Sequence, residues 1–264
     1  MKDQTGQTYR RYNLERLLKE AEKGNIKRGV ISVANIGNQI VVLKRSESRS
    51  YFPCWYTASV FGNVEYGESY ENAVLRELEE ELGLTQSDVK EMKSTGYVYD
   101  AVTNFLLRVF DVALHSKAEP RNNCPEEISL VRLCNQRDLL VSAHCLAKFF
   151  KLPNIIERSF FQEVFRSRSE FFDFLNAEIS KMQWIGLTPS SVCALFLCYC
   201  RTASDEKNLV KVDYEKHLSY QKLAHFDMEG VKVVVAECAS TGASLLVVYP
   251  VPLLELNKLC VCRM

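Results

Sequence analysis

One stretch of the sequence decides the fold: Gly62-Asn-Val-Glu-Tyr-Gly-Glu-Ser-Tyr-Glu-Asn-Ala-Val-Leu-Arg-Glu-Leu-Glu-Glu-Glu-Leu-Gly-Leu84. Its second half predicts an α-helix from Ser69 to Leu82. Ser69 is a favourable N-cap, because a serine hydroxyl can accept a hydrogen bond from a free N–H of the first turn. Gly83 is a typical residue just after a helix end. The first half, with its glycines, predicts a loop that leads into this helix.

The expected helix has two different faces. One face carries leucines that can pack on a sheet, and another carries glutamates spaced by three and four residues. The leucines are Leu75, Leu78 and Leu82, and the glutamates are Glu77, Glu80 and Glu81. Neighbouring carboxylates repel each other, whereas a divalent cation between them attracts all of them. Magnesium prefers oxygen ligands and often binds carboxylates together with substrate phosphate. The spacing therefore favours a Mg²⁺ or Mn²⁺ site that acts on a diphosphate.

The flanking residues make this interpretation more specific, because the whole stretch resembles the Nudix box. The specified positions of that pattern are filled by Gly62, Glu68, Arg76, Glu77, Leu78, Glu80, Glu81, Gly83 and Leu84. The resemblance covers roughly residues 25 to 150. It implies an α/β fold, namely an α/β/α sandwich with a mixed sheet. It also implies a metal-dependent hydrolase that cleaves a diphosphate linkage, most commonly in a nucleoside diphosphate linked to another group.

The resemblance assigns roles to residues of the box. Glu77, Glu80 and Glu81 are expected to bind the metal ion, and Glu80 and Glu81 are also expected to be catalytic. Glu68 and Arg76 are expected to form a supporting ion pair that orients the loop.

A second acidic group is expected from a late loop. Family members often add a carboxylate there, either as a further ligand or as the base that activates water. Glu126 and Glu127 come just before the expected strand 128–133, so either could be this group. The alternative is that both belong to a solvated loop.

Substrate contacts are expected around the start of the box. Gly62 and Gly67 would let the backbone bend close to phosphate, since glycine tolerates such conformations. Trp55 and Tyr99 could stack on a base, although aromatic side chains of this kind more often pack in a core or a loop. The composition gives no reason to favour capped RNA as a substrate and does not exclude it.

Two rival functions are compatible with a domain of this kind. An isopentenyl-diphosphate isomerase needs a catalytic cysteine in a segment that aligns near Thr57 to Asn63, and these positions hold neither cysteine nor histidine. Protonation of a double bond needs a positioned acid, so this rival is disfavoured. A catalytically silent Nudix domain that only binds a nucleotide or a protein is the other rival. The intact box argues against it.

The bulk composition narrows the class of protein. The 33 basic and 33 acidic residues balance, so the overall charge does not suggest nucleic acid or membrane binding. The first 24 residues do not resemble a secretory signal, and the apolar runs are too short for a membrane helix. The ten cysteines are therefore expected to be reduced thiols in a cytoplasmic protein. Zinc at the pairs Cys198/Cys200 and Cys260/Cys262 is a weaker alternative, because their spacing is not the usual one.

The hydrophobic pattern divides the chain into three parts. These are an N-terminal helical segment (1–24), the Nudix domain (25–153) and a C-terminal α+β region (154–264). The expected strands are 28–34, 39–43, 95–99, 105–114, 128–133, 231–238 and 244–251, and the expected later helices are 135–150 and 157–182; 192–200 is a buried element of either type. The C-terminal region could cover the pocket, set substrate choice or mediate formation of a homodimer.

Overall fold

The computed structural model describes residues 14–150, 152, 154–167, 169–170, 185–200 and 209–212. The two strands expected at 231–238 and 244–251 lie outside these residues, as does Cys260/Cys262. Most of the second half of the helix expected at 157–182 lies outside them as well.

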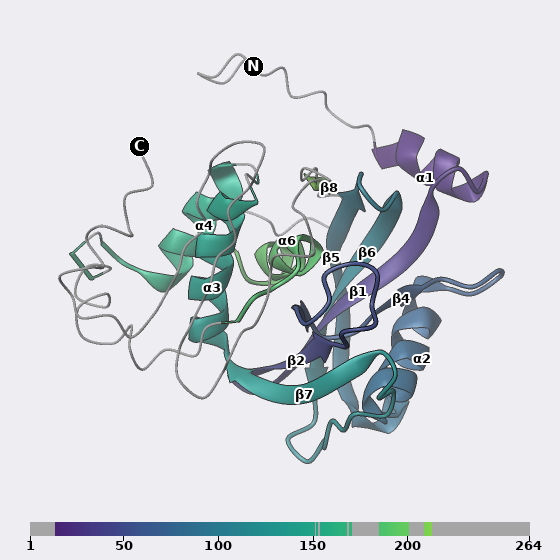
Figure 1. Ribbon diagram of the computed structural model, residues 1–264, viewed down its shortest axis with the longest axis horizontal. Coiled ribbons are helices and arrows are strands. Elements are labelled where there is room, and N and C mark those ends of the chain that lie inside the picture. Colours follow the sequence, from purple (N-terminus) through teal and green to yellow (C-terminus); the bar gives the residue numbers. More distant parts are fainter. Residues whose placement is uncertain are drawn as a thin grey trace.

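A mixed sheet forms the centre of the molecule (Figure 1). The strands are β1 (Lys27–Ile36), β2 (Gln39–Arg45), β3 (Tyr56–Ala58), β4 (Phe61–Asn63), β5 (Val89–Asp100), β6 (Phe105–Leu114), β7 (Ile128–Asn135) and β8 (Leu209–Val212). Their order is β3-β2-β1-β6-β5-β8, with β4 paired to β1 and β7 paired to β2. The pairs β1–β6 and β5–β8 are parallel, and the other pairs are antiparallel.

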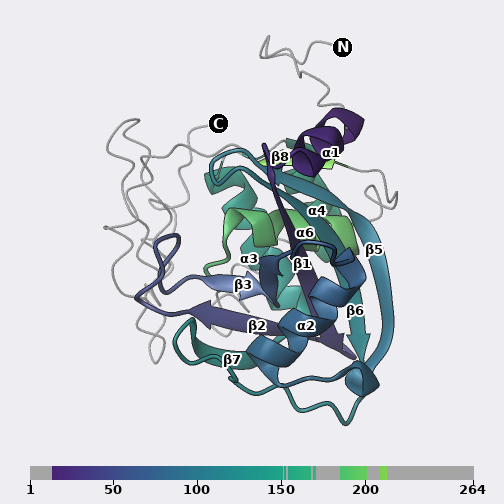
Figure 2. The ribbon, with the colours of Figure 1, turned by 90° about the vertical axis from the view of Figure 1, so that its right-hand side faces the viewer.

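Helices cover both faces of this sheet, as Figure 2 shows from the side of α2. The helices are α1 (Leu14–Glu22), α2 (Tyr70–Leu82), α3 (Gln136–Phe149), α4 (Asn154–Val164) and α6 (Pro189–Tyr199). Helix α2 packs on one face, whereas α3, α4 and α6 share a core cluster with the other face. Helix α1 packs near one end of the sheet through Leu17 and Ala21. The expected α/β/α sandwich with a mixed sheet is confirmed.

The alternation of side chains along β1 explains how one strand serves both cores. Val30 and Ala34 belong to the cluster that contains α2, whereas Ile31 and Val33 belong to the cluster that contains α3, α4 and α6. Successive residues of a strand point to opposite faces, so a strand buried on both faces is apolar throughout. The sequence of β1 therefore fits only a central position.

The apolar stripe of α2 differs slightly from the expected one. Leu78 and Leu82 are fully buried, but Leu75 is only half-buried and Val74 completes the stripe instead. Residues 74, 78 and 82 are each four apart, which keeps them on one face of the helix.

The expected helix over 157–182 is wrong as a single element. Helix α4 begins at Asn154 and ends at Val164. The Ser167 hydroxyl then accepts a hydrogen bond from the Glu170 N–H, and the Glu170 carboxylate accepts one from the Arg166 N–H. A serine followed three residues later by a glutamate is the signal for a new helix start. This signal interrupts the helical periodicity.

The element at 192–200 is a helix. Its N-cap is Thr188, whose hydroxyl accepts a hydrogen bond from the Ser191 N–H, and Pro189 occupies its first turn. Nearly all its side chains are buried, which is typical of a helix that is apolar on every side. Cys198 belongs to this packing, so in the described part of the chain it behaves as a core residue. No helix among the described residues is long and apolar enough to cross a membrane.

Candidate active site

The box forms a loop and a helix with the expected ends. The Ser69 hydroxyl accepts a hydrogen bond from the Asn72 N–H at 3.1 Å, so Ser69 is the N-cap of α2. Gly83 follows the helix in the left-handed conformation, with φ of 65°, and its N–H bonds the Glu79 carbonyl. These caps fix where α2 starts and ends, and therefore which way its glutamates point.

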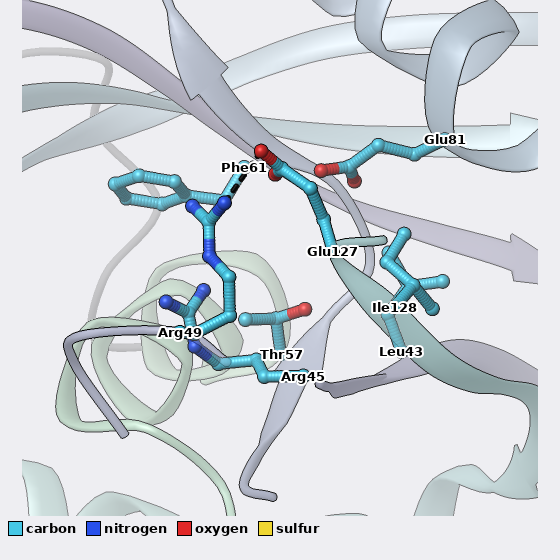
Figure 3. Close-up of a pocket in the computed structure, with 8 residues that line it drawn as sticks. All are labelled: Leu43, Arg45, Arg49, Thr57, Phe61, Glu81, Glu127 and Ile128. Carbon is cyan, nitrogen blue, oxygen red and sulfur yellow. Dashed lines mark ion pairs between the residues drawn. The ribbon is translucent and has the colours of Figure 1, made fainter. Parts of the chain in front are cut away.

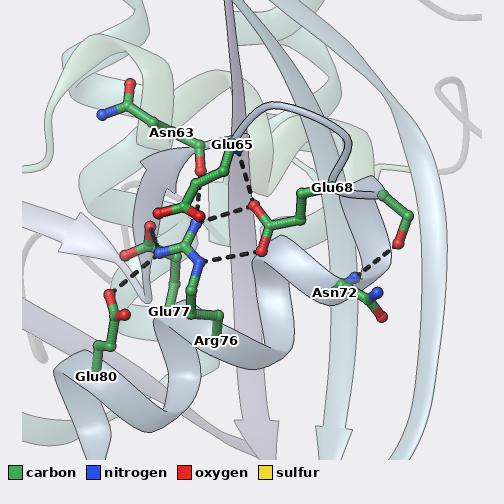
Figure 4. A network of polar contacts seen from close by, with 8 residues as sticks. Asn63, Glu65, Glu68, Asn72, Arg76, Glu77 and Glu80 are labelled. Carbon is green, nitrogen blue, oxygen red and sulfur yellow. Dashed lines mark hydrogen bonds and ion pairs between the residues drawn. The ribbon is translucent and has the colours of Figure 1, made fainter.

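Arg76 organises the N-terminal part of the site (Figure 4). Its Nε and Nη2 donate to the Glu68 carboxylate at 3.0 and 3.2 Å, and Nη2 also donates to the Asn63 carbonyl at 2.8 Å. Its Nη1 donates to Glu77 at 2.8 Å and to Glu80 at 3.1 Å. The structure thus brings Glu68 and Arg76 together as expected. Two of the three expected metal ligands, Glu77 and Glu80, also hydrogen-bond to Arg76, and we call this set the Arg76 network.

Gly62 has a different structural role from the expected one. It is buried in β4, and φ at Gly62 is not in the left-handed region, whereas Gly67 has φ of 79°. A Cβ atom at Gly62 would collide with the Glu77 carboxylate. Glycine is therefore required at 62 because Glu77 lies against its backbone.

Ser59 guides the chain into this position. It is a buried residue with a positive φ of 65°, which is uncommon for a residue with a side chain. Its hydroxyl accepts a hydrogen bond from the Ala34 N–H at 2.8 Å and donates one to the Val41 carbonyl at 2.7 Å. Ser59 thus bridges β1 and β2 at the point where the chain passes from β3 to β4. Sequence reasoning missed this residue, since its conformation leaves no pattern in the sequence.

The carboxylates of Glu77 and Glu81 are both buried, and Glu77 is paired with the Arg76 guanidinium. Burial raises the pKa of Glu77 from 4.5 to about 6, although the adjacent Arg76 guanidinium acts to lower it. Burial, together with the charges of Glu77 and Glu127, raises the pKa of Glu81 well above its ordinary value. The Phe61 N–H donates to Glu81, yet Glu81 Oε2 has no hydrogen-bond partner. An unpaired buried carboxylate oxygen is costly, and it marks a place that suits a cation.

A pocket lies next to Glu81 (Figure 3). Its lining residues are Leu43, Arg45, Arg49, Thr57, Phe61, Glu81, Glu127 and Ile128. Figure 3 shows the carboxylates of Glu81 and Glu127 directed toward each other, with Arg49 forming an ion pair with Glu127. The pocket therefore combines two carboxylates, two guanidinium groups and apolar walls.

Of the two late-loop candidates, Glu127 reaches this pocket. The Glu126 side chain interacts with the Cys124 thiol and raises the pKa of that thiol, though burial raises it more. The Glu126 backbone carbonyl accepts hydrogen bonds from the hydroxyls of Ser46 and Ser48. The two candidate residues therefore lie in different places. The Glu127 side chain faces Glu81 in the pocket, whereas Glu126 does not line the pocket.

Two asparagines hold the late loop in place. The Asn123 N–H donates to the Glu81 carbonyl at 3.1 Å, and the Asn123 amide donates to the Glu79 carbonyl at 3.1 Å. The Asn122 amide donates to the Ile128 carbonyl at 2.8 Å. The two Asn123 bonds attach the loop to carbonyls in the last turn of α2, and the Asn122 bond attaches it to the start of β7. No local pattern in the sequence indicates this role for the two asparagines.

The expected aromatic contacts lie elsewhere. Trp55 is only 1% exposed and packs against Phe52 and Phe150 in the core, so its ring faces are not open to a base. Tyr99 packs in the cluster that contains α1, and its hydroxyl donates to the Asn104 side chain at 3.3 Å. These placements favour structural roles for both. Phe61, which the stacking hypothesis omitted, lines the pocket instead.

The donor set fits a hard divalent cation. Carboxylate oxygens are the ligands that Mg²⁺ and Mn²⁺ prefer, and the unpaired Glu81 oxygen lies among them. In this conformation Glu77 and Glu80 are drawn to Arg76, and within the described residues no three acidic, histidine or cysteine side chains are already gathered as a ready metal cage. Magnesium commonly uses one or two carboxylates together with water and substrate phosphate, so a complete protein cage is not required.

Comparison with known proteins identifies similar chains for the central part of the sequence. Residues 25–152 match the family model described as NUDIX domain, so this part of the chain is identified as a Nudix domain. It is 32% identical over 93 residues to an uncharacterized Nudix hydrolase of Nostoc sp., covering 34% of this chain and 54% of that protein. It is 35% identical over 71 residues to an uncharacterized Nudix hydrolase of Pseudomonas aeruginosa, covering 26% and 42%. The chain thus spans about half the length of the curated relatives that it matches.

Similar solved structures include a protein from Deinococcus radiodurans, with 28% identity, a TM-score of 0.37, and coverage of 44% of this chain and 70% of that one. A MutT NUDIX hydrolase from Burkholderia pseudomallei has 23% identity, a TM-score of 0.35, and coverage of 42% and 84%.

Proposed function

We propose that the protein is a metal-dependent hydrolase that cleaves a diphosphate linkage, with water attacking a phosphorus atom. The substrate class that we propose is a nucleoside diphosphate linked to another group. The observation that carries the proposal is the buried Glu81 carboxylate, which has an unpaired oxygen and faces Glu127 across a pocket lined by arginines. The match of residues 25–152 to the NUDIX domain model supports it.

Each residue of the site has a proposed role. Glu77, Glu80 and Glu81 would hold Mg²⁺ or Mn²⁺. When bound, such an ion neutralises phosphate oxygens and makes water a better nucleophile. Glu127 is placed to accept a proton from the attacking water, since its carboxylate lies at the pocket and faces Glu81. Arg76 positions Glu77 and Glu80, because it hydrogen-bonds both.

The pocket also supports hydrolysis over isomerisation. Phe61 lies in the segment where the isomerase would need its acid, and it contributes a ring to the pocket wall. A phenyl ring carries no proton to donate to a double bond. The catalytically silent binding module is the alternative that experiment must separate, because it would keep the same pocket.

A substrate panel tests the proposal. The protein is incubated with Mg²⁺ or Mn²⁺ and with nucleoside triphosphates, dinucleoside polyphosphates, ADP-ribose, NADH, nucleotide sugars, coenzyme A, thiamine diphosphate or capped RNA, and products are identified by mass. We expect scission at a diphosphate. The double variant Glu80→Gln, Glu81→Gln should lose about a thousandfold in rate, since metal-based charge stabilisation contributes several kcal/mol.

Glu79→Gln is the matched control. Glu79 is an exposed glutamate on the same helix, and its exposed side chain contributes nothing to the Arg76 network. It should keep full activity. Cleavage that survives the double variant would overturn the residue assignment. A protein that cleaves nothing and binds no Mn²⁺ in calorimetry would overturn the function.

The broader organisation stays a prediction. Helices α4 and α6 lie beyond residue 153 and share a core with α3 and the sheet. Limited proteolysis tests whether residues 154–264 form a separate accessory region. Light scattering of the purified chain tests whether it is a homodimer, and fractionation of cells tests the expected cytoplasmic location.

A further inference from the structure

The ion pair between Arg49 and Glu127 occupies the pocket next to the candidate metal ligands. Arg49 lies in the loop after β2, and Glu127 lies in the turn before β7. The two segments are tied together, because the Ser46 N–H donates to the Glu127 carbonyl at 2.8 Å. The backbone therefore holds Arg49 and Glu127 side by side even when their side chains change partners.

This ion pair differs from the Arg76 network in its strength. The Arg49 and Glu127 side chains are 34% and 44% exposed, whereas those of Arg76 and Glu68 are 25% and 14% exposed. Exposed ion pairs contribute little because water screens them and both side chains lose rotational freedom. A stronger anion can therefore displace the Glu127 carboxylate from Arg49 at small cost.

We propose that Arg49 is a phosphate-binding residue that exchanges partners on substrate binding: it holds Glu127 in the free protein and binds a substrate phosphate in the complex. The exchange frees from Arg49 the Glu127 carboxylate, which already faces Glu81 across the pocket. The inference rests on the proposed function for its catalytic meaning. The proposal that Arg49 binds phosphate depends only on the contacts of Arg49 with Glu127 and with the pocket.

The chemistry of the pocket favours a phosphate group as the incoming anion. A guanidinium group forms two parallel hydrogen bonds with phosphate oxygens, and these bonds are stronger than those between neutral groups. Arg45 lines the same pocket and adds a second positive charge there. With Glu127 released from Arg49, both guanidinium groups contribute to binding a polyphosphate chain that extends past Glu81.

The test measures binding of imidodiphosphate, which resembles diphosphate but resists hydrolysis at its bridging nitrogen. Isothermal calorimetry is carried out in EDTA, so that no metal ion contributes, and again with Mg²⁺. Arg49→Gln should weaken binding in EDTA by about tenfold or more, because a charge-assisted contact is lost. Glu127→Gln should strengthen binding several-fold, because the competing carboxylate is removed. Arg49→Lys should fall between wild type and Arg49→Gln, since it keeps the charge and loses the fork.

Arg121→Gln is the matched control. Arg121 also pairs with a glutamate, Glu119, but both side chains are about three-quarters exposed and neither lines the pocket. This variant should bind imidodiphosphate like the wild type. Thermal melting of Arg49→Gln and Arg121→Gln should be alike, which excludes unfolding as the cause of a lost affinity.

The exchange predicts opposite changes in imidodiphosphate affinity for Arg49→Gln and Glu127→Gln, and this distinguishes it from other roles of the two residues. Unchanged affinity in Arg49→Gln would show that Arg49 does not bind phosphate and would overturn the inference. Weaker binding in Glu127→Gln would show that Glu127 supports the ligand and would overturn the exchange. If both variants change imidodiphosphate affinity as expected but the protein cleaves no member of the substrate panel, the phosphate site is supported and the proposed hydrolase function is overturned.

Discussion

Two arginines meet the glutamates of the site in different ways. Arg76 donates to Glu68, Glu77 and Glu80 and to a backbone carbonyl, and it is three-quarters buried. Arg49 forms an ion pair with Glu127 at the solvent edge of the pocket. The first arrangement has its charges and hydrogen bonds satisfied before any ligand arrives. The Arg49–Glu127 ion pair, in contrast, is exposed enough for a ligand to separate the two side chains.

The difference predicts that Arg76 supports the fold much more than Arg49 does. Replacing Arg76 by Gln leaves Glu68 and Glu77, which are 14% and 10% exposed, without their cation. Breaking a buried ion pair costs about 3 to 5 kcal/mol, and the lower end applies because Arg76 is partly exposed. We expect a loss of about 3 kcal/mol in the free energy of unfolding, measured by urea denaturation in EDTA.

Arg76→Lys sharpens this prediction. A lysine keeps the charge but cannot form the several hydrogen bonds of the guanidinium group. Its loss in the free energy of unfolding should therefore lie between zero and the loss in Arg76→Gln. A loss below about 0.5 kcal/mol in Arg76→Gln, as for an exposed pair, would contradict the view that the network is structural.

Gly62→Ala tests the packing that holds the Arg76 network in place. The new Cβ would collide with the Glu77 carboxylate, so Glu77 or β4 must move. Overpacking of this kind costs about 2 kcal/mol. We expect that loss in urea denaturation, together with weaker Mn²⁺ binding in calorimetry, because Glu77 is a proposed ligand. Gly67→Ala is the comparison, since a Cβ there meets no atom and only the positive φ of 79° is strained. Weakened Mn²⁺ binding in Gly67→Ala but not in Gly62→Ala would contradict the packing argument.

The sequence predicts one side of this comparison far better than the other. Glu68, Arg76 and Glu77 lie within the box, where helical spacing and the family pattern place them together. The partnership of Arg49 with Glu127 joins residues 78 positions apart, and no local pattern encodes it. Its geometry depends on the hydrogen bond from Ser46 to Glu127, which forms only when β2 and β7 pair.

The elements of the fold show the same contrast between local and long-range patterns. The pattern of β6 gave its bounds correctly, because the strand is rich in branched and aromatic residues, which favour strands. The strands β3 and β4 were missed, since three residues are too few for a periodic signal. For Trp55 the sequence left open stacking on a base or packing in the core, and it packs in the core; an aromatic residue beside a motif does not reveal which side of the chain it occupies.

Glu81→Gln separates binding of a cation from stability of the fold. The pKa of Glu81 in the folded protein is raised above its unfolded value, so its contribution to stability is present at low pH and is lost as pH rises. Replacing this carboxylate by an amide removes the buried charge. In EDTA at pH 8 we expect Glu81→Gln to be more stable than wild type by roughly 1 to 2 kcal/mol, the cost of an unpaired buried polar group.

The pH dependence supplies the control for Glu81→Gln. Near pH 3, below the ordinary glutamate pKa, the wild-type carboxyl is protonated in both the folded and unfolded states, so the difference in stability between the two proteins should shrink. Addition of Mg²⁺ at pH 8 should stabilise the wild type more than the variant, because binding to the folded state alone raises stability. A variant that is less stable than wild type at pH 8 in EDTA would refute the idea that Glu81 is held at a cost for cation binding.

Arg49→Gln is expected to have the smallest effect on stability, and this makes it informative. An exposed ion pair contributes about 0 to 1 kcal/mol, so the free energy of unfolding should change by no more than about 0.5 kcal/mol. The same variant should lose phosphate affinity, as argued above. Together these two results would show that Arg49 contributes to ligand binding and contributes little to the stability of the fold. Urea denaturation of Arg49→Gln beside Arg76→Gln measures this contrast directly, and equal losses in the two variants would remove the distinction between a fixed and an exchangeable arginine.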